Sequence, residues 1–155
     1  MIIRPMTPAD VGDCARIMVE TPLWQRHGVT AQAARDRLLG GIASGAGLFV
    51  IVDQEGEPAA GFVWCVERGA FDRSGYIRIL AVEGQRRGQG IGGVLLRHAE
   101  AYLSQTAPDV FLLVSDFNRD AQRFYERNGY AQIGAIPGYL SPGVAELLYH
   151  KRLRD

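Results

Sequence analysis

The run from Gln85 to Gly93, QRRGQGIGG, is the stretch of this sequence best suited to binding an anion. It follows an apolar segment, 76–82, that is typical of a buried strand. It also opens a helical pattern in which residues on one face recur every three or four positions as far as Tyr102. The first N–H groups of a helix have no partner within the helix, and the helix dipole favours negative charge there. Glycine lets the backbone approach a ligand without a Cβ clash. The run therefore predicts a site for a phosphate-bearing ligand.

Two nucleotide-binding motifs compete for this run. Gly88, Gly90 and Gly93 match the G-x-G-x-x-G pattern of dinucleotide-binding folds, and Asp116 ends the next strand, near where a ribose-binding acid belongs. However, the polar segment 83–87 separates the strand from the glycines, and the unit lies behind antiparallel strands in the middle of the chain. A P-loop is excluded because no Lys-Ser/Thr pair follows the glycines.

Two motifs together indicate a family. The segment 85–90 resembles the Q/R-x-x-G-x-G/A motif of the GNAT superfamily of acetyl-CoA-dependent N-acetyltransferases. The segment 118–130, with Asn118, Ala121, Phe124-Tyr125 and Gly129-Tyr130, is similar to that family's second signature and follows another buried strand, 110–114. The order of the predicted elements also agrees with the family over the whole chain.

The resemblance implies acetyl-CoA as cosubstrate, without a metal. The pyrophosphate would lie on the amides of 87–92 at the helix start, and the arginines at 86 and 87 could add charged contacts. The pantetheine arm would pair with the backbone at 80–82, where one N–H would polarise the thioester carbonyl. Asn118 would bind the same arm, cap the following helix, or do both. The residues so assigned are Leu80, Ala81, Val82, Gln85, Arg86, Arg87, Gly88, Gln89, Gly90, Ile91, Gly92 and Asn118.

The resemblance also implies that Tyr125 is the general acid that protonates the leaving thiolate of coenzyme A, because a phenol with a pKa near ~10 carries its proton at neutral pH. The spacing alone fits a buried helix stripe equally well. The general base cannot be transferred from the family. Where relatives place a glutamate, this sequence has Tyr76 and Leu113. The remaining candidates are Glu67, Asp72, Glu83, Glu146 and His27, or a water chain.

The acceptor is expected to be a primary amine, on a small molecule, a peptide N-terminus or a lysine side chain. By resemblance its site includes Trp24, His27 and Tyr139. No Cys or Ser stands out as a covalent relay, so direct attack in a ternary complex is expected. The alternative is a non-catalytic acyl-CoA-binding or sensory module on the same fold. Its main support is that the family's usual general base is missing from this sequence.

The strands and helices expected from the sequence, which position these residues, indicate an α/β (α+β) fold. We expect a single domain, 1–155, with a mixed, mostly antiparallel sheet of about seven strands and about four helices, in the order β-α-α-β-β-β-α-β-α-β-β. We expect helices to start at Thr7 and Thr30, and two more to start at the two motifs. In the helix that starts at Thr30, Leu39 is expected to face inward. The segment 68–75 is expected to be a polar loop, and 23–28 an irregular segment.

Composition narrows the function further. Seventeen basic and seventeen acidic residues cancel, which argues against a nucleic-acid partner. Cys14 and Cys65 lie in apolar patterns and are expected to be reduced core thiols. No apolar run has the length of a membrane span, and no signal peptide opens the sequence, so we expect a cytoplasmic protein without a membrane partner. Relatives are often dimers, which leaves a homodimer open.

Overall fold

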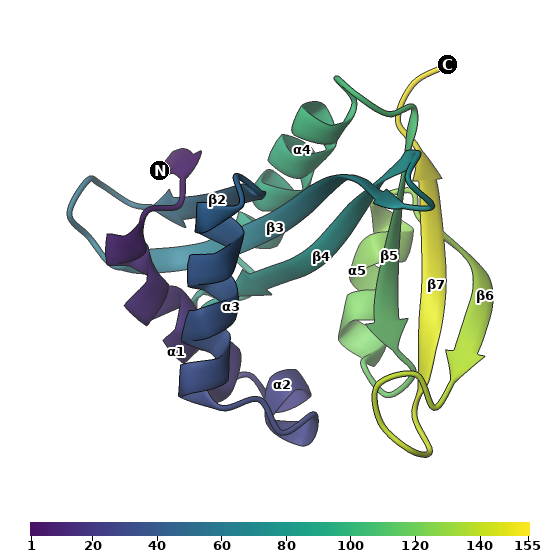
Figure 1. The fold of residues 1–155 in the computed structure, drawn as a ribbon, viewed down its shortest axis with the longest axis horizontal. Coiled ribbons are helices and arrows are strands. Elements are labelled where there is room, and N and C mark those ends of the chain that lie inside the picture. The colour runs from purple at the N-terminus through teal and green to yellow at the C-terminus, as the bar shows by residue number, and fades with distance from the viewer.

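The protein is built on one seven-stranded sheet in the order β1-β2-β3-β4-β5-β7-β6, seen in a computed structural model that describes residues 1–155 (Figure 1). All neighbouring strands are antiparallel except β4 and β5, which are parallel. This confirms the expected mixed, mostly antiparallel sheet. The strands are β1 (Ile2–Pro5), β2 (Gly47–Val52), β3 (Ala59–Ala70), β4 (Ser74–Val82), β5 (Asp109–Ser115), β6 (Ala131–Pro137) and β7 (Ala145–Arg152).

Helices cover both faces of the sheet. One face carries α1 and α3, and the other carries α4 and α5 (Figure 1). The predicted irregular segment contains the short helix α2, which lies below α1 and α3 near the gap that separates β4 from β5. The helices are α1 (Val11–Glu20), α2 (Pro22–Arg26), α3 (Ala31–Ala43), α4 (Ile91–Leu103) and α5 (Arg119–Arg127), with 3₁₀ turns at Pro8–Asp10 and Gly84–Arg86. None of the helices is long and apolar enough to cross a membrane.

Helix ends fall where the capping residues predict. The Thr30 hydroxyl accepts a hydrogen bond from the Ala33 N–H (3.1 Å) at the start of α3. The Thr7 N–H donates to the Asp10 carboxylate (2.8 Å) at the 3₁₀ turn before α1. Gly129 follows α5 with a φ of +90°, the left-handed conformation that ends a helix.

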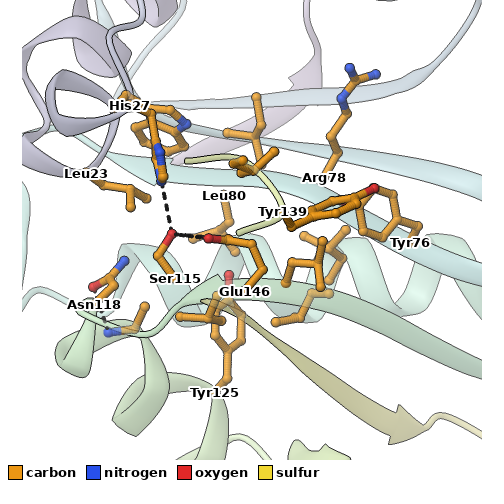
Figure 2. A pocket seen from close by; sticks show the side chains of 18 residues that line it. Leu23, His27, Tyr76, Arg78, Leu80, Ser115, Asn118, Tyr125, Tyr139 and Glu146 are labelled. Atoms are coloured by element: carbon orange, nitrogen blue, oxygen red, sulfur yellow. Dashed lines mark hydrogen bonds between the residues drawn. The ribbon is translucent and has the colours of Figure 1, made fainter. Parts of the chain in front are cut away.

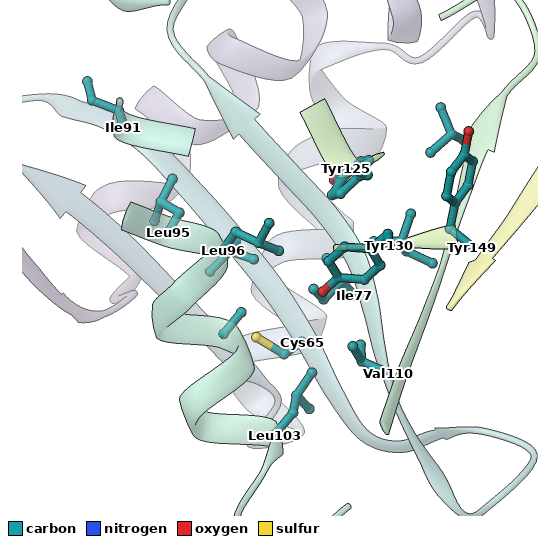
Figure 3. Close-up of a cluster of buried hydrophobic side chains, with 14 of the residues drawn as sticks. Cys65, Ile77, Ile91, Leu95, Leu96, Leu103, Val110, Tyr125, Tyr130 and Tyr149 are labelled. Carbon is teal, nitrogen blue, oxygen red and sulfur yellow. The ribbon is translucent and has the colours of Figure 1, made fainter. Parts of the chain in front are cut away.

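Two apolar clusters form the core, one on each side of the sheet. The first packs α1 and α3 against β2, β3 and β4, and it contains Cys14. The second packs α4 and α5 against β3, β4, β5 and β7, and it contains Cys65 and Tyr125 (Figure 3). Both cysteines are buried and free, and burial raises the pKa of the Cys65 thiol to about 12. They are therefore unreactive packing residues.

The sheet opens between its two parallel strands. Pairing between β4 and β5 covers only Gly75 to Ile77 on β4 and Val110 to Leu112 on β5. The register between β3 and β4 shifts at the next position, because Cys65 faces Ile77 whereas Trp64 faces Ile79. Arg78 is thus the extra residue of a β-bulge, and such a bulge bends its strand away from a neighbour. Beyond it β4 and β5 diverge (Figure 1).

Two expectations from the sequence are wrong. The polar segment 68–75 is not a loop throughout, since Ala70 pairs with Ser74 and the hairpin turns only at 71–73. The side chains of this segment are polar because the end of the hairpin is exposed to solvent, not because strand pairing is absent. Leu39 does not face inward. Ala34, Leu38 and Gly41 form the buried stripe of α3, and Leu39, one position round the helix, is 44% exposed.

Candidate active site

A cleft of about 180 Å³ opens where β4 and β5 diverge (Figure 2). Its walls come from β4 between Tyr76 and Leu80, from β5 between Leu112 and Ser115, and from the start of α5. Side chains of α2 and of the loop between β6 and β7 close its outer side. Thirteen of the 18 lining residues are hydrophobic, so the few polar groups in the cleft are prominent.

The structure brings six of the sixteen predicted site residues into this cleft. One group comes from the coenzyme and catalytic predictions, namely Leu80, Asn118 and Tyr125, and the other from the acceptor prediction, namely Trp24, His27 and Tyr139. Ala81 and Val82 continue β4 past the cleft toward the glycine loop. The segments that the sequence separates thus meet along one edge of β4.

The glycine loop has the geometry expected of an anion site. Gly88 and Gly90 have φ values of +76° and +83°, which L side chains rarely adopt. The first helical hydrogen bond joins the Val94 N–H to the Gly90 carbonyl (3.1 Å), which leaves the N–H groups of 91–93 without a helical partner. Gln85, Gln89, Ile91 and Gly92 belong to the same turn and helix start.

The two arginines of the loop differ in their partners. Arg86 donates to both carboxylate oxygens of Asp53 (2.9 and 3.0 Å) and to the Gln89 side chain (3.1 Å). The hydrogen bond from Arg86 lowers the pKa of the Asp53 carboxyl. Arg87 is exposed and has only a 3.5 Å contact to the Thr21 hydroxyl. Arg87 is therefore the freer of the two cations.

Asn118 caps α5 and also lines the cleft, and Tyr125 is packed in the core and also lines the cleft. The Asn118 Oδ1 accepts the Ala121 N–H (3.3 Å) as the cap of α5, and the side chain also lines the cleft. The Tyr125 ring packs edge-on against Phe124. It also packs edge-on against Tyr130 in the core (Figure 3), and its hydroxyl points to the cleft (Figure 2). Burial raises the pKa of Tyr125 above its ordinary value. The phenol therefore keeps its proton throughout the neutral range.

A hydrogen-bonded chain that the sequence does not reveal crosses the cleft. The Ser115 hydroxyl donates to the Glu146 carboxylate (2.8 and 3.1 Å), and its oxygen lies 3.0 Å from His27 Nε2 (Figure 2). His27 Nδ1 lies 3.0 Å from the Ser141 hydroxyl. Ser115 is not among the residues predicted from the sequence, whereas Glu146 is one of the base candidates. The position of Glu146 inside the apolar run 144–149 is a signal that distinguishes it from the other candidates.

The other base candidates lie elsewhere. Glu67, Asp72 and Glu83 do not line the cleft. Tyr76 does line it, and burial raises the pKa of this phenol as well. The structure contains no group of three or more His, Cys, Asp or Glu side chains placed to hold a metal ion.

Comparison with known proteins defines the family. Residues 14–130 match the model of the acetyltransferase (GNAT) family, which is most of the chain, so this protein belongs to that family. The resemblance inferred from the two motifs is thereby confirmed.

One curated relative is N-alpha-acetyltransferase 60 of Xenopus tropicalis, which is 39% identical over 70 residues. That match covers 43% of this chain but only 29% of the relative, so the chain spans less than a third of it.

Solved structures share the whole fold. An aminoglycoside 6'-N-acetyltransferase complexed with coenzyme A superimposes with a TM-score of 0.82 at 16% identity, covering 100% of this chain and 98% of the other. Ard1 from Thermoplasma volcanium has a TM-score of 0.80 at 21% identity, covering 99% and 98%. At these identities the likeness establishes the fold alone.

Proposed function

We propose that this protein transfers the acetyl group of acetyl-CoA to a primary amine by direct attack in a ternary complex. The observation that carries the proposal is the divergence of β4 and β5, which leaves the β4 backbone unpaired on one side from Arg78 onward. The Tyr125 hydroxyl and the glycine loop both lie along this edge. A pantetheine arm can pair with such an edge as an added strand does.

Each part of the coenzyme then has a partner of suitable chemistry. The pyrophosphate binds the free N–H groups at the start of α4, beside Arg87. The pantetheine arm runs along Leu80 to Val82 and reaches Asn118. The thioester lies in the apolar part of the cleft, where a backbone N–H of β4 stabilises the oxyanion that forms on attack.

Tyr125 supplies the proton that the leaving group needs. The amine nitrogen forms a bond to the thioester carbon, the C–S bond breaks, and the thiolate receives the Tyr125 proton. The raised pKa keeps the Tyr125 phenol protonated until the thioester arrives. The donor is neutral before the transfer, so this state is compatible with its apolar surroundings.

Release of the free thiol from acetyl-CoA tests the proposal. We expect turnover with at least one member of a panel of alkylamines, amino acids and peptides with free N-termini. Coenzyme A, and not NAD, should bind in a calorimetric titration. Binding of coenzyme A without thiol release for any amine would instead support the non-catalytic acyl-CoA-binding module.

A further inference from the structure

Glu146 is a buried carboxylate without a cationic partner. It is only 3% exposed, and its side chain accepts hydrogen bonds from one group, the Ser115 hydroxyl. None of the ion pairs of the protein includes it. A carboxylate can accept about four hydrogen bonds, and a buried charge is costly unless it is paired. Glu146 therefore has unused acceptor capacity, and it lines the cleft.

The neighbouring strands hold this carboxylate in place. Ser115 and Glu146 are direct partners in the antiparallel pair β5–β7, and Ile136 of β6 lies opposite Glu146 on its other side. The backbone of Glu146 is thus fixed between two strands, and its side chain is directed into the opening of the sheet (Figure 2).

The hydrogen atoms of the chain can be assigned in order. Ser115 has one hydroxyl hydrogen, which it donates to Glu146, so its oxygen accepts the Nε2–H of His27. His27 Nδ1 then accepts the Ser141 hydroxyl hydrogen. This tautomer is assigned from the network, and it makes every donor in the chain support a negative charge on Glu146.

We propose that Glu146 binds the amino group of the acceptor and is the general base of the acetyl transfer, with Ser115 and His27 as positioning residues. The inference rests on the proposed function and identifies the acceptor as an amine that reaches the cleft as a cation. The ammonium group supplies the missing partner of Glu146 and gives one proton to its carboxylate. The freed amine attacks the thioester, and the adduct loses its second proton to water.

The proton count balances over one turnover. The ammonium acceptor gives one proton to Glu146 before attack and a second to water after the C–N bond forms, and Tyr125 gives one to the thiolate when the C–S bond breaks. The protonated carboxyl then releases its proton to solvent, and the Tyr125 phenolate takes one back. An ammonium ion and acetyl-CoA have become an amide, coenzyme A and one proton in solvent, with no oxidant or metal required.

The other charged and titratable groups that line the cleft are each occupied by another contact or are phenols. Arg78 of β4 has its guanidinium 4.6 Å from the centre of the Trp64 ring, a cation–π contact. Tyr76 of β4, Tyr125 of α5 and Tyr139 of the β6–β7 loop are phenols. His27, which follows α2, has both ring nitrogens occupied. Glu146 is the one carboxylate that lines the cleft.

The substitution Glu146→Gln tests the proposal in the full chain. It keeps the size of the side chain and an acceptor for Ser115 but removes the base. We expect kcat/KM for the amine to fall about 100- to 1,000-fold, while coenzyme A affinity stays within about twofold because the coenzyme contacts other residues. The matched control is Glu57→Gln, which removes an exposed carboxylate in the β2–β3 turn and should leave both quantities unchanged.

Amine basicity separates a base from a structural residue. For acceptors that are already unprotonated at the assay pH, the defect of Glu146→Gln should shrink at least tenfold, since less proton abstraction is needed. Ser115→Ala and His27→Gln should lower kcat/KM by about ten- to 100-fold, the usual loss for a residue that orients a functional group, and should shift the acidic limb of the pH–rate profile. A defect equal for all amines, with an unshifted profile, would show that Glu146 is structural.

The outcomes also distinguish this inference from the proposed function. Full activity of Glu146→Gln would overturn the inference and leave the acetyltransferase proposal standing. Absence of turnover by the unmodified protein with every amine would overturn the proposal itself. Should Glu146→Gln lose coenzyme A binding, Glu146→Asp decides. It retains the charge but withdraws it by one methylene, and we expect at least a tenfold loss for the amine, whereas unchanged activity contradicts the inference.

Discussion

The Arg86 guanidinium binds the Asp53 carboxylate through two hydrogen bonds of 2.9 and 3.0 Å, which tie the glycine loop to the end of β2. Arg86 also holds Gln89 within the loop. The guanidinium must leave Asp53 before it can bind a phosphate with both of these donors. Arg87, one residue further on, has no such partner.

We therefore predict different behaviour for the two arginines. Arg87→Ala should weaken coenzyme A binding about two- to fivefold, as expected for an exposed charge contact. The loss should diminish at high salt because the interaction is screened. The loss of affinity should also be smaller for a truncated coenzyme that lacks the pyrophosphate. Titration calorimetry of both ligands at two salt concentrations measures these effects.

Arg86 is expected to act through Asp53. Arg86→Ala and Asp53→Asn should change coenzyme A affinity by similar factors, and the double variant should be no worse than either single one. Additive losses in this cycle would mean that Arg86 contacts the phosphate directly and that its pairing with Asp53 is incidental.

Tyr125→Phe should lower kcat about 100- to 1,000-fold while the KM for acetyl-CoA stays nearly constant, because in the proposed mechanism Tyr125 protonates the thiolate. Burial raises the pKa of Tyr125. The protonated form therefore persists as the pH rises, and the unmodified enzyme should show no alkaline loss from this group up to about pH 10. Steady-state rates from pH 6 to 10 test both points.

Tyr130→Phe is the matched control for that experiment. Its ring centre lies 5.5 Å from that of Tyr125 in the same core cluster, but Tyr130 does not line the cleft. It should retain the kcat of the unmodified protein. Equal losses in both variants would indicate a packing effect rather than acid catalysis.

The sequence predicts the local parts of this fold well, because they depend on neighbouring residues. Thr30 caps α3, Gly129 ends α5 and the glycine loop starts α4 where expected. By contrast, the sequence does not predict that β7 lies between β5 and β6 in the sheet. Strand order depends on contacts between distant segments, and no periodicity encodes it.

The choice among the base candidates Glu67, Asp72, Glu83, Glu146 and His27 stayed open for the same reason. His27 and Ser115 are 88 positions apart, and Ser115 and Glu146 are 31 apart. They meet only because β5 pairs with β7 and because α2 lies over the open end of the sheet. The family's usual glutamate positions hold Tyr76 and Leu113, so comparison by position could not indicate a carboxylate that comes from another strand.

The proposed acceptor role of Tyr139 can be tested without a change in folding. Tyr139 is 57% exposed although it lines the cleft. Tyr139→Ala should leave the melting temperature within about 1 °C, as is usual for an exposed site, and should raise the KM for the amine several-fold. The KM for acetyl-CoA should not change.

Trp24 should give the same kinetic pattern with an added cost in stability. It lines the cleft but also packs against the core cluster beneath α1 and α3. Trp24→Ala should lower the free energy of unfolding by about 2–3 kcal/mol, less than for a fully buried tryptophan. A folded Trp24→Ala variant with unchanged amine kinetics would exclude Trp24 from the acceptor site.

The ion pair between Arg4 and Asp10 should make the free energy of unfolding decrease at acidic pH. Arg4 donates to both oxygens of Asp10 (2.8 and 2.9 Å), and the Thr7 N–H donates to the same carboxylate. Burial alone would raise the pKa of Asp10, but the hydrogen bonds from Arg4 and Thr7 outweigh it and lower the pKa. A lowered folded pKa contributes stability above the unfolded value of about 3.9, and that stability is lost as the pH falls further.

Asp10→Asn should therefore cost about 1–3 kcal/mol at pH 7 and less below pH 3, where the native carboxylate is itself becoming protonated. Urea unfolding at the two pH values measures the difference. Glu55→Gln is the control, because Glu55 also pairs with Arg4 but its side chain is 63% exposed. Its cost should stay below about 0.5 kcal/mol at both pH values.

The position of Ser115 makes the kinetic mechanism itself worth testing. Its hydroxyl lies between the Glu146 carboxylate and the His27 imidazole, an arrangement that could activate a nucleophile. Direct transfer predicts intersecting initial-rate lines when acetyl-CoA and amine are varied together. It also predicts no acetylated protein after incubation with acetyl-CoA alone. Parallel lines, with an added acetyl group on Ser115 in the intact-mass spectrum, would instead establish a covalent relay. We expect the intersecting pattern because the Ser115 hydrogen bond runs to Glu146, which leaves the carboxylate, and not the hydroxyl, facing the acceptor.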